Sequence, residues 1–466
     1  MKRTLIDQLT QAVDTQVKIL GWVSVRRDHG KLIFLDVRDS TATVQVVYQL
    51  SDQDKELIET LKPESVVEII GQVKQRPERM VNPEMKTGTI ELGAEKIHVI
   101  NQAQTPPFEI HDKHTEAGEE VRMQYRYLDL RNERMQHNIR FRHRFIKALR
   151  DYLDARDFVE IETPILTKSS PEGARDFIVP SRLSEGSFYA LPQAPQQFKQ
   201  LLMVAGFERY YQIARCFRDE DLRLDRQPEF TQLDIEMSFV DQEAILTLCE
   251  DMFREVIREL LPEKKIPDSF QRLTYDEAMS KHGSDKPDLR SNKKDDDELA
   301  FAWVTDFPMF ERDNTGKITF AHNPFARPRD EDLHLLDSDN PEDLLKVRAY
   351  CYDLVLNGVE ISSGSLRIHD PALQHKIFTL MGLSDEQTKE RFGAFMKAFT
   401  FGAPPHGGLA PGLDRLIMVL LKQDSIRDVI AFPKTGDMRD LMLGAPGKAA
   451  SEHLRELGLQ VRKQEK

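Results

Sequence analysis

The sequence predicts an α+β protein with two unlike parts, a small N-terminal β-barrel and a larger domain in which helices flank an antiparallel sheet. Residues 17–100 form five short segments of alternating hydrophobicity separated by turn residues, a pattern typical of a small barrel or sandwich. Beyond residue 130, helical periods alternate with strand-like runs without strict βαβ repetition. That mixture favours an antiparallel sheet covered by helices.

The five N-terminal segments are expected to be strands, and they read VKILGWVSV, KLIFLDVRD, ATVQVVYQ, SVVEIIGQVKQR and TIELGAEKIHVI. Residues 52–61, between the third and fourth segments, have a helical pattern. A five-stranded OB barrel has its single helix at this place. We therefore predict an OB-fold over residues 1–103.

The stretch AQTPPFEI contains adjacent prolines and ends the strand pattern. We place a linker at residues 104–130 and the larger domain at residues 131–466. Within that domain, periodicity predicts helices over residues 138–157, 241–261, 343–357 and 385–399. The runs YYQIARCF, FTQLDIEMSF and EISSGSLRI are expected to be strands.

The composition is that of an ordinary globular protein. Of 466 residues, 40% are hydrophobic and 31% are charged, which excludes a low-complexity chain. Apolar runs are far shorter than the roughly 18 residues that cross a bilayer, and MKRTLIDQLTQAV lacks the apolar region of a secretory signal. Three cysteines without metal-ligand spacing indicate reduced thiols in a cytoplasm. We expect no disulfide, no zinc and no membrane contact.

The charge is unevenly distributed along the chain. A net charge of −13 by itself disfavours nucleic acid as a partner. Residues 122–150, however, contain nine Lys or Arg and only two acidic residues. This stretch is either a solvated helix face or a surface that contacts phosphates.

One charged loop has the features of a binding site. Arg218 and Glu220 follow the run YYQIARCF, and FTQLDIEMSF returns as a second strand, so the loop is a hairpin tip. A fixed Arg218 would bind a phosphate through two hydrogen bonds, and Phe230 offers a ring on which a base would stack. No G-x-G-x-x-G or G-x-x-x-x-G-K-[ST] pattern follows a strand, so a Rossmann or P-loop site is not expected.

Three segments, in order, resemble the motifs of one family along essentially the whole chain. FVEIETPILTKSSPEGARDF resembles motif 1, FRDEDLRLDRQPEFTQLDIEMSF motif 2 and GGLAPGLDRLIMVLL motif 3 of the bacterial-type class II aspartyl-tRNA synthetases. LPQAPQQFKQLLM and GVEISSGSLRIHDP, which lie between them, are similar too. The resemblance implies an anticodon-binding OB-fold, a hinge, and a catalytic domain that forms aspartyl-adenylate from L-aspartate and ATP and charges tRNA-Asp.

The chain departs from that family at one place. Bacterial members usually carry a large inserted GAD domain between segments like HGSDKPDLR and FAWVTDFPMF, whereas here only residues 291–300 separate them. The sequence is compatible with a natural or an engineered absence. No motif residue lies in the missing part, so activity is expected to survive.

The resemblance implies two catalytic arginines and one metal site. Arg218 would bind the α-phosphate and the aspartate α-carboxylate, and Arg415 the γ-phosphate, tasks that suit a planar guanidinium. Asp353 and Glu360 match the positions that hold Mg²⁺, a cation that prefers oxygen ligands. The other positions that match ATP ligands are Asp219, Glu220, Gln227, Phe230, Glu360, Gly412, Leu413 and Asp414.

The resemblance also implies a pocket for the amino acid. Lys199 and Arg367 match the ligands of the side-chain carboxylate, and His322 is placed to assist them. Asparagine would leave two buried cations unpaired, so discrimination without editing is expected. The remaining implied ligands are Glu172, Gln196 and Asp234, at the ammonium group, and Gln197 and Phe198.

On the barrel, Phe34 and Gln45 resemble the family's anticodon-reading pair, in which the ring stacks on a splayed base and the amide bonds a base edge. From composition alone Phe34 would be assigned to the barrel core. Arg26 and Arg27, in the adjoining loop, are expected on tRNA phosphates.

Two positions bear on whether tRNA-Asn is also a partner. His29, in the loop RRDHG, resembles enzymes that charge both tRNAs, whereas Arg79, in RPERMVNP, differs from the small residue that such enzymes tend to have. The two signals conflict, and we favour His29 because it acts nearest the third anticodon base.

Two alternatives compete with an aspartate-tRNA ligase. An asparaginyl-tRNA synthetase shares the architecture, but Lys199 and Arg367 are ligands for an acidic substrate. A non-catalytic tRNA-binding paralogue would be expected to have lost Arg218, Arg415 or the carboxylate pair. Motif 1, with Pro164, also predicts a homodimer, since this motif packs against its symmetry mate in the class.

Overall fold

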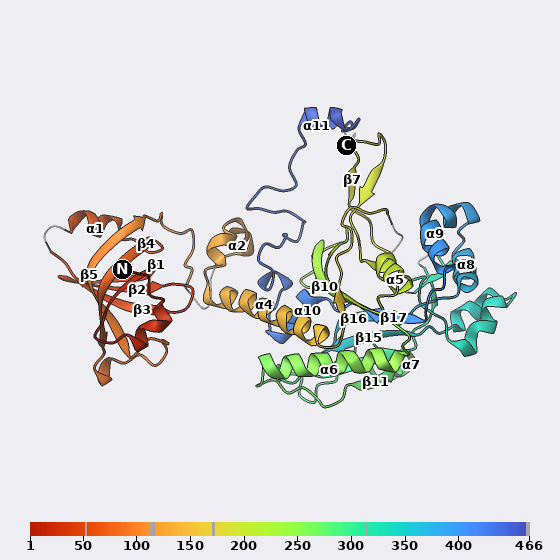
Figure 1. The fold of residues 1–466 in the computed structure, drawn as a ribbon, viewed down its shortest axis with the longest axis horizontal. Helices are drawn as coiled ribbons and strands as arrows, with labels where there is room; N and C mark the ends of the chain where they lie inside the picture. The colour runs from red at the N-terminus through yellow and green to blue at the C-terminus, as the bar shows by residue number, and fades with distance from the viewer. Residues whose placement is uncertain (52–53, 112–116, 170–172, 314, 322, 463–466) are drawn as a thin grey trace. The chain divides into compact units, whose positions relative to one another are not determined.

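The computed structural model describes residues 1–51, 54–111, 117–169, 173–313, 315–321 and 323–462. The chain divides into two compact units, Met1–Glu133 and Arg134–Lys466. In Figure 1 the first runs from red to orange and the second from orange to blue.

The first unit contains a closed five-stranded barrel, with the strand order β1-β2-β3-β5-β4 (Figure 1). Alternate side chains of each strand point inward and form an apolar core that includes Val23, Leu35 and Val46, as the period-two pattern predicts. The elements of the barrel are η1 (Ile6–Gln11), β1 (Gln16–His29), β2 (Leu32–Arg38), β3 (Thr43–Gln49), α1 (Lys55–Thr60), β4 (Val66–Gln75), η2 (Glu78–Met80) and β5 (Ile90–Asn101). This is the predicted OB-fold.

The first strand is longer than predicted. β1 continues to His29, and Arg27 pairs with Phe34 of β2. The prediction that Arg26, Arg27 and His29 lie in a loop was therefore wrong. Cross-strand pairing with β2 keeps these charged residues extended, which local polarity did not indicate.

A buried carboxylate fastens the linker to the barrel. Glu64 accepts hydrogen bonds from Arg38 of the barrel and from Arg131, the residue that follows the linker, and it pairs with His111 of the linker at 2.9 Å. Burial opposes its ionisation, but these three partners outweigh burial and lower the pKa of Glu64 to about 2. Two short helices, α2 (Glu119–Gln124) and α3 (Arg126–Asp129), complete the linker.

The second unit is built on an eight-stranded sheet with the order β11-β12-β15-β16-β17-β10-β9-β6. The middle pairs are antiparallel, as predicted, whereas the outer pairs β11·β12 and β6·β9 are parallel. Its strands are β6 (Val159–Glu160), β9 (Arg209–Phe217), β10 (Glu229–Ser238), β11 (Gln271–Thr274), β12 (Phe301–Thr305), β15 (Cys351–Leu356), β16 (Val359–Leu366) and β17 (His406–Leu409). Two separate hairpins are β7 (Ile178–Pro180) with β8 (Phe188–Ala190), and β13 (Phe310–Arg312) with β14 (Ile318–Phe320).

Helices α4, α6 and α10 share one hydrophobic core with this sheet, through residues such as Phe145, Phe253 and Leu416. Helices α8 and α9 contribute Phe378, Phe392 and other rings to a smaller aromatic cluster. The helices are α4 (Glu133–Asp154), α5 (Gln196–Val204), α6 (Gln242–Leu260), α7 (Tyr275–His282), α8 (Pro371–Leu380), α9 (Asp385–Phe399), α10 (Leu413–Leu420), α11 (Ser451–Glu456) and the 3₁₀ turns η3 (Asp330–Asp337), η4 (Pro341–Lys346) and η5 (Ile426–Asp428).

One predicted helix was wrong. Residues 343–357 contain the 3₁₀ turn η4 and then the strand β15, all six residues of which are buried. A central strand buried on both faces has no alternation, and a short apolar run of this kind cannot be distinguished from a helix by periodicity. The predicted helices near residues 138–157, 241–261 and 385–399 are present.

Residues 291–300 form a compact turn, and Ser291 and several of its neighbours are exposed, as the charged sequence predicts. The Glu298 carboxylate accepts hydrogen bonds from the backbone N–H and hydroxyl of Ser291 and from the N–H of Asn292. Arg290 bridges Asp288 and Asp296. The segment that stands in place of an inserted domain is thus closed by its own side chains.

The basic stretch at residues 122–150 spans the boundary of the two units, and most of its charges are neutralised by acidic residues of the unit to which each belongs. Arg122 and Arg126 pair with Asp129, Arg134 with Asp428, and Arg150 with Glu160. These ion pairs leave less free positive charge than the sequence suggested. Among the described residues, no helix is both long and apolar enough to cross a membrane.

Candidate active site

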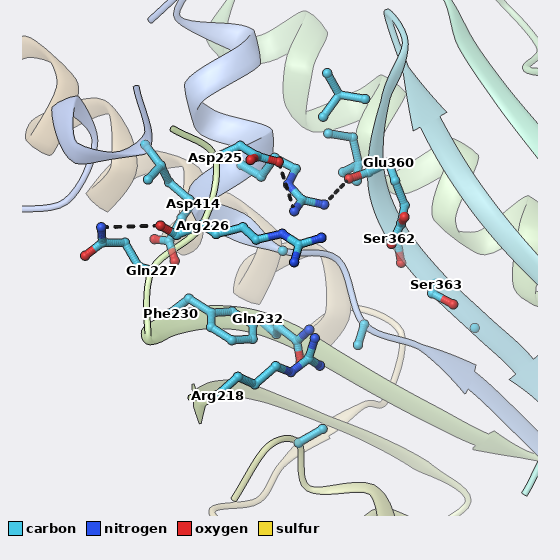
Figure 2. A pocket seen from close by; sticks show the side chains of 18 of the residues that line it. Arg218, Asp225, Arg226, Gln227, Phe230, Gln232, Glu360, Ser362, Ser363 and Asp414 are labelled. Carbon is cyan, nitrogen blue, oxygen red and sulfur yellow. Dashed lines mark hydrogen bonds and ion pairs between the residues drawn. The ribbon is translucent and has the colours of Figure 1, made fainter. Parts of the chain in front are cut away.

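A cavity of about 540 Å³ opens over the middle of the eight-stranded sheet. Its walls come from the β9–β10 hairpin, from β16, and from the start of α10. Figure 2 shows Phe230, Gln232 and Arg218 on one side and Glu360, Ser362 and Ser363 on the other. Residues far apart in the sequence therefore meet in one cavity.

Arg218 and Phe230 lie together at the base of the hairpin. The Arg218 N–H donates to the Pro228 carbonyl at 2.8 Å, which closes the loop. The guanidinium carbon lies 5.1 Å from the centre of the Phe230 ring, within the range of a cation–π contact. The Arg218 Nε is buried without a hydrogen-bond partner. This arginine is held by packing and keeps donor capacity for an anion.

Arg415, on α10, is oriented by its neighbours. Its Nη1 donates to the Glu360 carbonyl at 2.7 Å, and its Nη2 lies 3.2 Å from the Asp225 carboxylate of the hairpin loop. Figure 2 draws both contacts as dashed lines beside the labelled Asp225 and Glu360. The Asp225 carboxylate thus occupies the place of an anion on Arg415.

Two carboxylates meet across the β15–β16 hairpin. Its turn is Asn357–Gly358, both with positive φ, as a two-residue hairpin of this type requires. Asp353 is buried and its Oδ1 has no hydrogen-bond partner. Burial raises the pKa of Asp353 well above its usual value, and the charge of Glu360 raises it further.

These carboxylates fit a divalent cation that arrives with a nucleotide. Two like charges at one place need a counter-charge, and an orphaned buried oxygen is a ready ligand. Among the described residues, no cluster of three or more His, Cys, Asp or Glu could hold a metal ion. Mg²⁺, however, is commonly bound by one or two carboxylates together with substrate phosphates, so this pair meets the requirement.

A buried quartet of alternating charge lies at the floor of the cavity. Lys199 Nζ lies 2.6 Å from Asp234 Oδ1 and 3.5 Å from Glu236 Oε2. Arg367 donates to both Glu236 oxygens, at 3.0 and 3.2 Å. Burial opposes the ionisation of Glu236, but the charges of Arg367 and Lys199 outweigh burial and keep its pKa below the usual range. Burial raises the pKa of Asp234.

The close approach of β17 to β10 positions Glu236. A side chain on Gly408 would lie 2.0 Å from the Ile235 carbonyl and 2.3 Å from a Glu236 oxygen. Only glycine fits there, so the GG pair of the third motif permits the quartet to form. His406, which precedes the two glycines in β17, is buried between the Gln200 amide and the Pro404 carbonyl.

Most of the predicted ligands line the cavity. They are Gln196, Lys199, Arg218, Glu220, Gln227, Phe230, Glu360, Arg367, Gly412, Asp414 and Arg415. The structure does not bring the predicted Asp219, Gln197, Phe198 or Leu413 to the cavity wall, and Leu413 is fully buried in the hydrophobic core. Asp234 lies directly behind Lys199. The predicted Glu172 and His322 are outside the described residues.

Two of the predicted ATP ligands have their polar groups engaged by the protein. Gln227 accepts from the Lys434 N–H at 2.7 Å and donates to the Lys434 carbonyl at 3.1 Å. Asp414 accepts from the Thr231 N–H at 2.7 Å and pairs with Arg142. Both side chains therefore hold the hairpin and α10 in position.

Three residues were missed in the sequence. Glu236 lies two residues after Asp234, so both carboxylates share one face of β10; that spacing was the available signal. Asp225 and Lys286 belong to the segments LRLDRQ and GSDKPD; both segments resemble the family, but nothing in them singled out these two residues.

Two of the predicted anticodon residues, Phe34 and Gln45, share the outer face of the barrel. Phe34 is half-buried on that face rather than in the core, and its ring meets His29 edge-on at 5.5 Å. Gln45 of β3 is opposite Asp36 of β2. Asp36 lies two residues after Phe34, so Gln45 is on the same face of the sheet as Phe34. Arg79 is exposed on η2.

Both arginines near this face already have acidic partners. Arg27 makes two hydrogen bonds of 2.8 Å to Asp36. Arg26 donates to Asp28 and to the Leu61 carbonyl. A phosphate would have to compete with Asp28 and Asp36 for these arginines.

Comparison with known proteins defines the class first. Residues 118–436 match the family described as tRNA synthetases class II (D, K and N), and residues 17–100 match the OB-fold nucleic acid binding domain. A solved structure of asparaginyl-tRNA synthetase from Pyrococcus horikoshii, complexed with asparaginyl-adenylate, has a TM-score of 0.73 at 22% identity and covers 93% of this chain and 98% of its own. That likeness supports the fold and does not identify the amino acid.

Sequence relatives narrow the class. The aspartate–tRNA(Asp/Asn) ligase of Rubrobacter xylanophilus is 42% identical over 574 residues, covering 96% of this chain and 95% of its own. The aspartate–tRNA ligase of Staphylococcus epidermidis is 39% identical, covering 97% of each chain. The chain belongs to the class II tRNA synthetases, within their aspartate–tRNA ligase family. The 574 aligned residues exceed the 466 of this chain, so the relative has residues without a counterpart here.

Proposed function

We propose that this enzyme is an aspartate–tRNA ligase that activates L-aspartate with ATP and transfers it to the 3′ end of tRNA-Asp. The observation that carries the proposal is the buried quartet: Lys199 and Arg367, each backed by a carboxylate, line the cavity that also contains Arg218 and Arg415. The side chains proposed to bind the amino acid thus lie in the same cavity as those proposed to bind the phosphates.

Activation needs no general base, because the attacking α-carboxylate of aspartate is already ionised. One carboxylate oxygen forms a bond to the α-phosphorus of ATP, and the bond to the bridging oxygen of pyrophosphate breaks. Negative charge grows on the phosphoryl oxygens, where preorganised cations stabilise the transition state most. Arg218 supplies this charge at the α-phosphate, Phe230 stacks on the adenine, and Arg415 releases Asp225 to bind the γ-phosphate.

Asp353 and Glu360 are the residues that would hold Mg²⁺. When bound, the cation supplies charge neutralisation on the triphosphate. We propose no role for zinc.

The quartet selects aspartate over asparagine in a way that differs from the sequence prediction. Lys199 and Arg367 are not unpaired without substrate, since Asp234 and Glu236 compensate them. Their remaining groups facing the cavity are all hydrogen-bond donors. The substrate carboxylate accepts from these donors, whereas an asparagine amide would bring its own NH₂ group against them. Asparagine is therefore rejected because its NH₂ group would face the N–H donors of Lys199 and Arg367 without an acceptor.

The barrel reads the anticodon in this proposal, with Phe34 as a stacking platform and Gln45 as the residue that bonds a base edge. His29, which touches Phe34, is next to the third base, and we propose that the enzyme charges tRNA-Asn as well as tRNA-Asp.

We also propose a homodimer. β6 is a two-residue edge strand of the sheet, and around it Val159, Ile165 and Leu166 are exposed. Exposed apolar side chains at a sheet edge are typical of a contact with a second chain. The enzyme would act in the cytoplasm.

Two assays on the full chain test this function. Pyrophosphate exchange should be strong with aspartate and weaker by about 100-fold or more with asparagine, because the site rejects the amide. Aminoacylation of purified tRNA-Asp and tRNA-Asn then tests transfer. Exchange with asparagine at the aspartate level would instead indicate an asparaginyl enzyme, and the lack of exchange with either would indicate a tRNA-binding paralogue.

A further inference from the structure

Lys286 is a cation of the active-site cavity to which neither the sequence motifs nor the proposed mechanism assigns a role. It follows α7, and its Nζ lies 2.8 Å from Glu360 Oε2. It lines the same cavity as Arg218 and Arg415. Glu360 is one of the two proposed metal ligands. The Lys286 ammonium group therefore pairs with a carboxylate that would otherwise be available to the cation.

The backbone around Lys286 is fixed. Its N–H donates to the Ser284 hydroxyl at 3.0 Å, and Pro287, the next residue, is buried. Asp288 packs against the β15–β16 turn, where a side chain on Gly358 would lie 3.3 Å from the Asp288 Cβ. Arg290 pairs with Asp288 at 2.9 Å. The loop is therefore anchored to the hairpin that carries Glu360, while the long lysine side chain stays free to swing.

Charge balance predicts what Lys286 does when the cavity fills. Without nucleotide, Asp353 and Glu360 place two carboxylates close together, and Lys286 offsets part of their charge. Burial opposes the charged form of Lys286, yet the pair with Glu360 raises its pKa. A divalent cation on the same carboxylates would repel the ammonium group. The anion that enters with that cation is the triphosphate.

We propose that Lys286 is a positioning residue, which holds Glu360 in the empty enzyme and moves to the triphosphate when ATP and its divalent cation bind. The inference rests on the proposed function, because it requires that the cavity binds ATP. It has a distinctive consequence: Lys286 competes with the cation before nucleotide binds and assists the nucleotide afterwards.

The experiment compares the full-length parent with Lys286→Met, in which the length is kept and the charge is lost. Manganese binding without nucleotide is measured by the electron paramagnetic resonance of free Mn²⁺, and ATP binding with Mg²⁺ by equilibrium dialysis. We expect Mn²⁺ affinity to rise about threefold, as the loss of a partly exposed ion pair allows. ATP affinity should fall about tenfold, as the loss of a charged hydrogen bond to phosphate predicts.

Lys281→Met is the matched control, since Lys281 pairs with Glu277 at 3.0 Å on the exposed face of α7. It should change neither affinity. If Lys286→Met weakens both ligands, the residue is structural and the inference is wrong. An unchanged ATP affinity or an unchanged Mn²⁺ affinity would also overturn it.

The parent is assayed for aspartate-dependent pyrophosphate exchange in parallel. Absence of exchange in the parent contradicts the proposed function, whereas normal exchange with unresponsive Lys286→Met contradicts only the role of this lysine.

Discussion

Arg218 and Arg415 both line the candidate active-site cavity, but their side chains differ in their partners. Arg218 lies over Phe230 with its Nε unpartnered, and Arg415 is paired with Asp225. The first is held ready by packing, and the second must exchange one carboxylate for a phosphate. A difference of this kind depends on neighbours distant in the sequence.

At this scale, replacing Arg218 by Ala should abolish adenylate formation. We expect pyrophosphate exchange to fall by at least about 10²–10³-fold, the cost of losing a preorganised charge on the transition state. The temperature of unfolding should stay close to that of the parent, because the guanidinium makes no ion pair with any residue in the described part of the chain. Arg215→Ala, at an exposed arginine of the preceding strand β9, serves as the control. A folded Arg218→Ala enzyme with near-normal exchange would show that the assignment is wrong.

Arg367→Leu should impair the use of aspartate far more than the binding of ATP. We expect kcat/KM for aspartate to fall by about 10²-fold or more and ATP affinity to change by less than about threefold. Because buried Glu236 then loses the closer of its two cationic partners and keeps only Lys199 at 3.5 Å, the variant should also lose about 3–5 kcal/mol of stability.

The double variant Arg367→Leu with Glu236→Gln separates the two effects. Without a buried carboxylate to compensate, stability should be largely restored, whereas aspartate use should not recover. Kinetics and urea unfolding of the three proteins provide the measurement. Recovery of activity together with stability would mean that Arg367 acts only through the fold.

At the scale of elements, the site depends on hairpins. The β9–β10 hairpin carries Arg218 and Phe230, the β15–β16 hairpin joins Asp353 to Glu360, and β2 and β3 carry Phe34 and Gln45. Each hairpin brings together two side chains that are apart in the sequence, although none of these pairs is directly opposite in the strand register.

Phe34→Ala and Gln45→Ala should weaken aminoacylation and spare adenylate formation, since the barrel strands make none of the catalytic cavity. We expect kcat/KM for tRNA to fall by about tenfold or more for Phe34→Ala, the worth of stacking one base. Pyrophosphate exchange should stay within about twofold of the parent. Gln49→Ala, at the exposed end of β3, is the matched control. Equal damage to both steps would show that Phe34 and Gln45 are structural.

The Glu64 cluster makes a prediction about pH. The pKa of Glu64 is lowered from 4.5 to about 2, so the folded state favours its ionised form. The resulting stability is fully present above pH 4.5 and is lost as pH falls toward 2. Glu64→Gln should therefore cost about 2–3 kcal/mol at pH 7, and the difference from the parent should shrink below pH 4.5.

Urea unfolding of the full chain at neutral and acidic pH measures this effect. Trp22 fluorescence is a suitable probe, because its ring lies near Arg38 and Arg131, two partners of Glu64. Glu68→Gln, in a partly exposed pair with Lys18, should show a much smaller loss. A loss that is the same at both pH values would contradict the assignment of the shift to ionised Glu64.

At the scale of the whole molecule, the choice of tRNA requires both units, one for the anticodon and one for the amino acid. We predict that tRNA-Asp and tRNA-Asn are both charged, because His29 can donate or accept a hydrogen bond and so tolerates either third base. Steady-state charging of the two tRNAs tests this. The prediction fails if tRNA-Asp is preferred by more than about 100-fold, the discrimination of one well-read base. His29→Leu should reduce charging of tRNA-Asn in an enzyme with dual specificity and have little effect in a strict one.

Much of the architecture and the site could be predicted from the sequence. Alternation identified the five barrel strands, and amphipathic periods identified α6 and α9, because each pattern reflects one buried face. The prediction of a helix over residues 343–357 was wrong because β15 is buried on both faces, so its sequence shows no alternation. Arginines and carboxylates in recognisable order indicated the chemistry of the site.

The sequence by itself thus determined the class of fold, the OB barrel, and eleven of the residues that line the cavity. Only the tertiary structure decided how their charges are shared: Glu236 between Lys199 and Arg367, Asp225 on Arg415, and Lys286 on Glu360. The physical reason is that an ion pair depends on distance and burial, and both arise when strands and loops far apart in the chain are packed against each other.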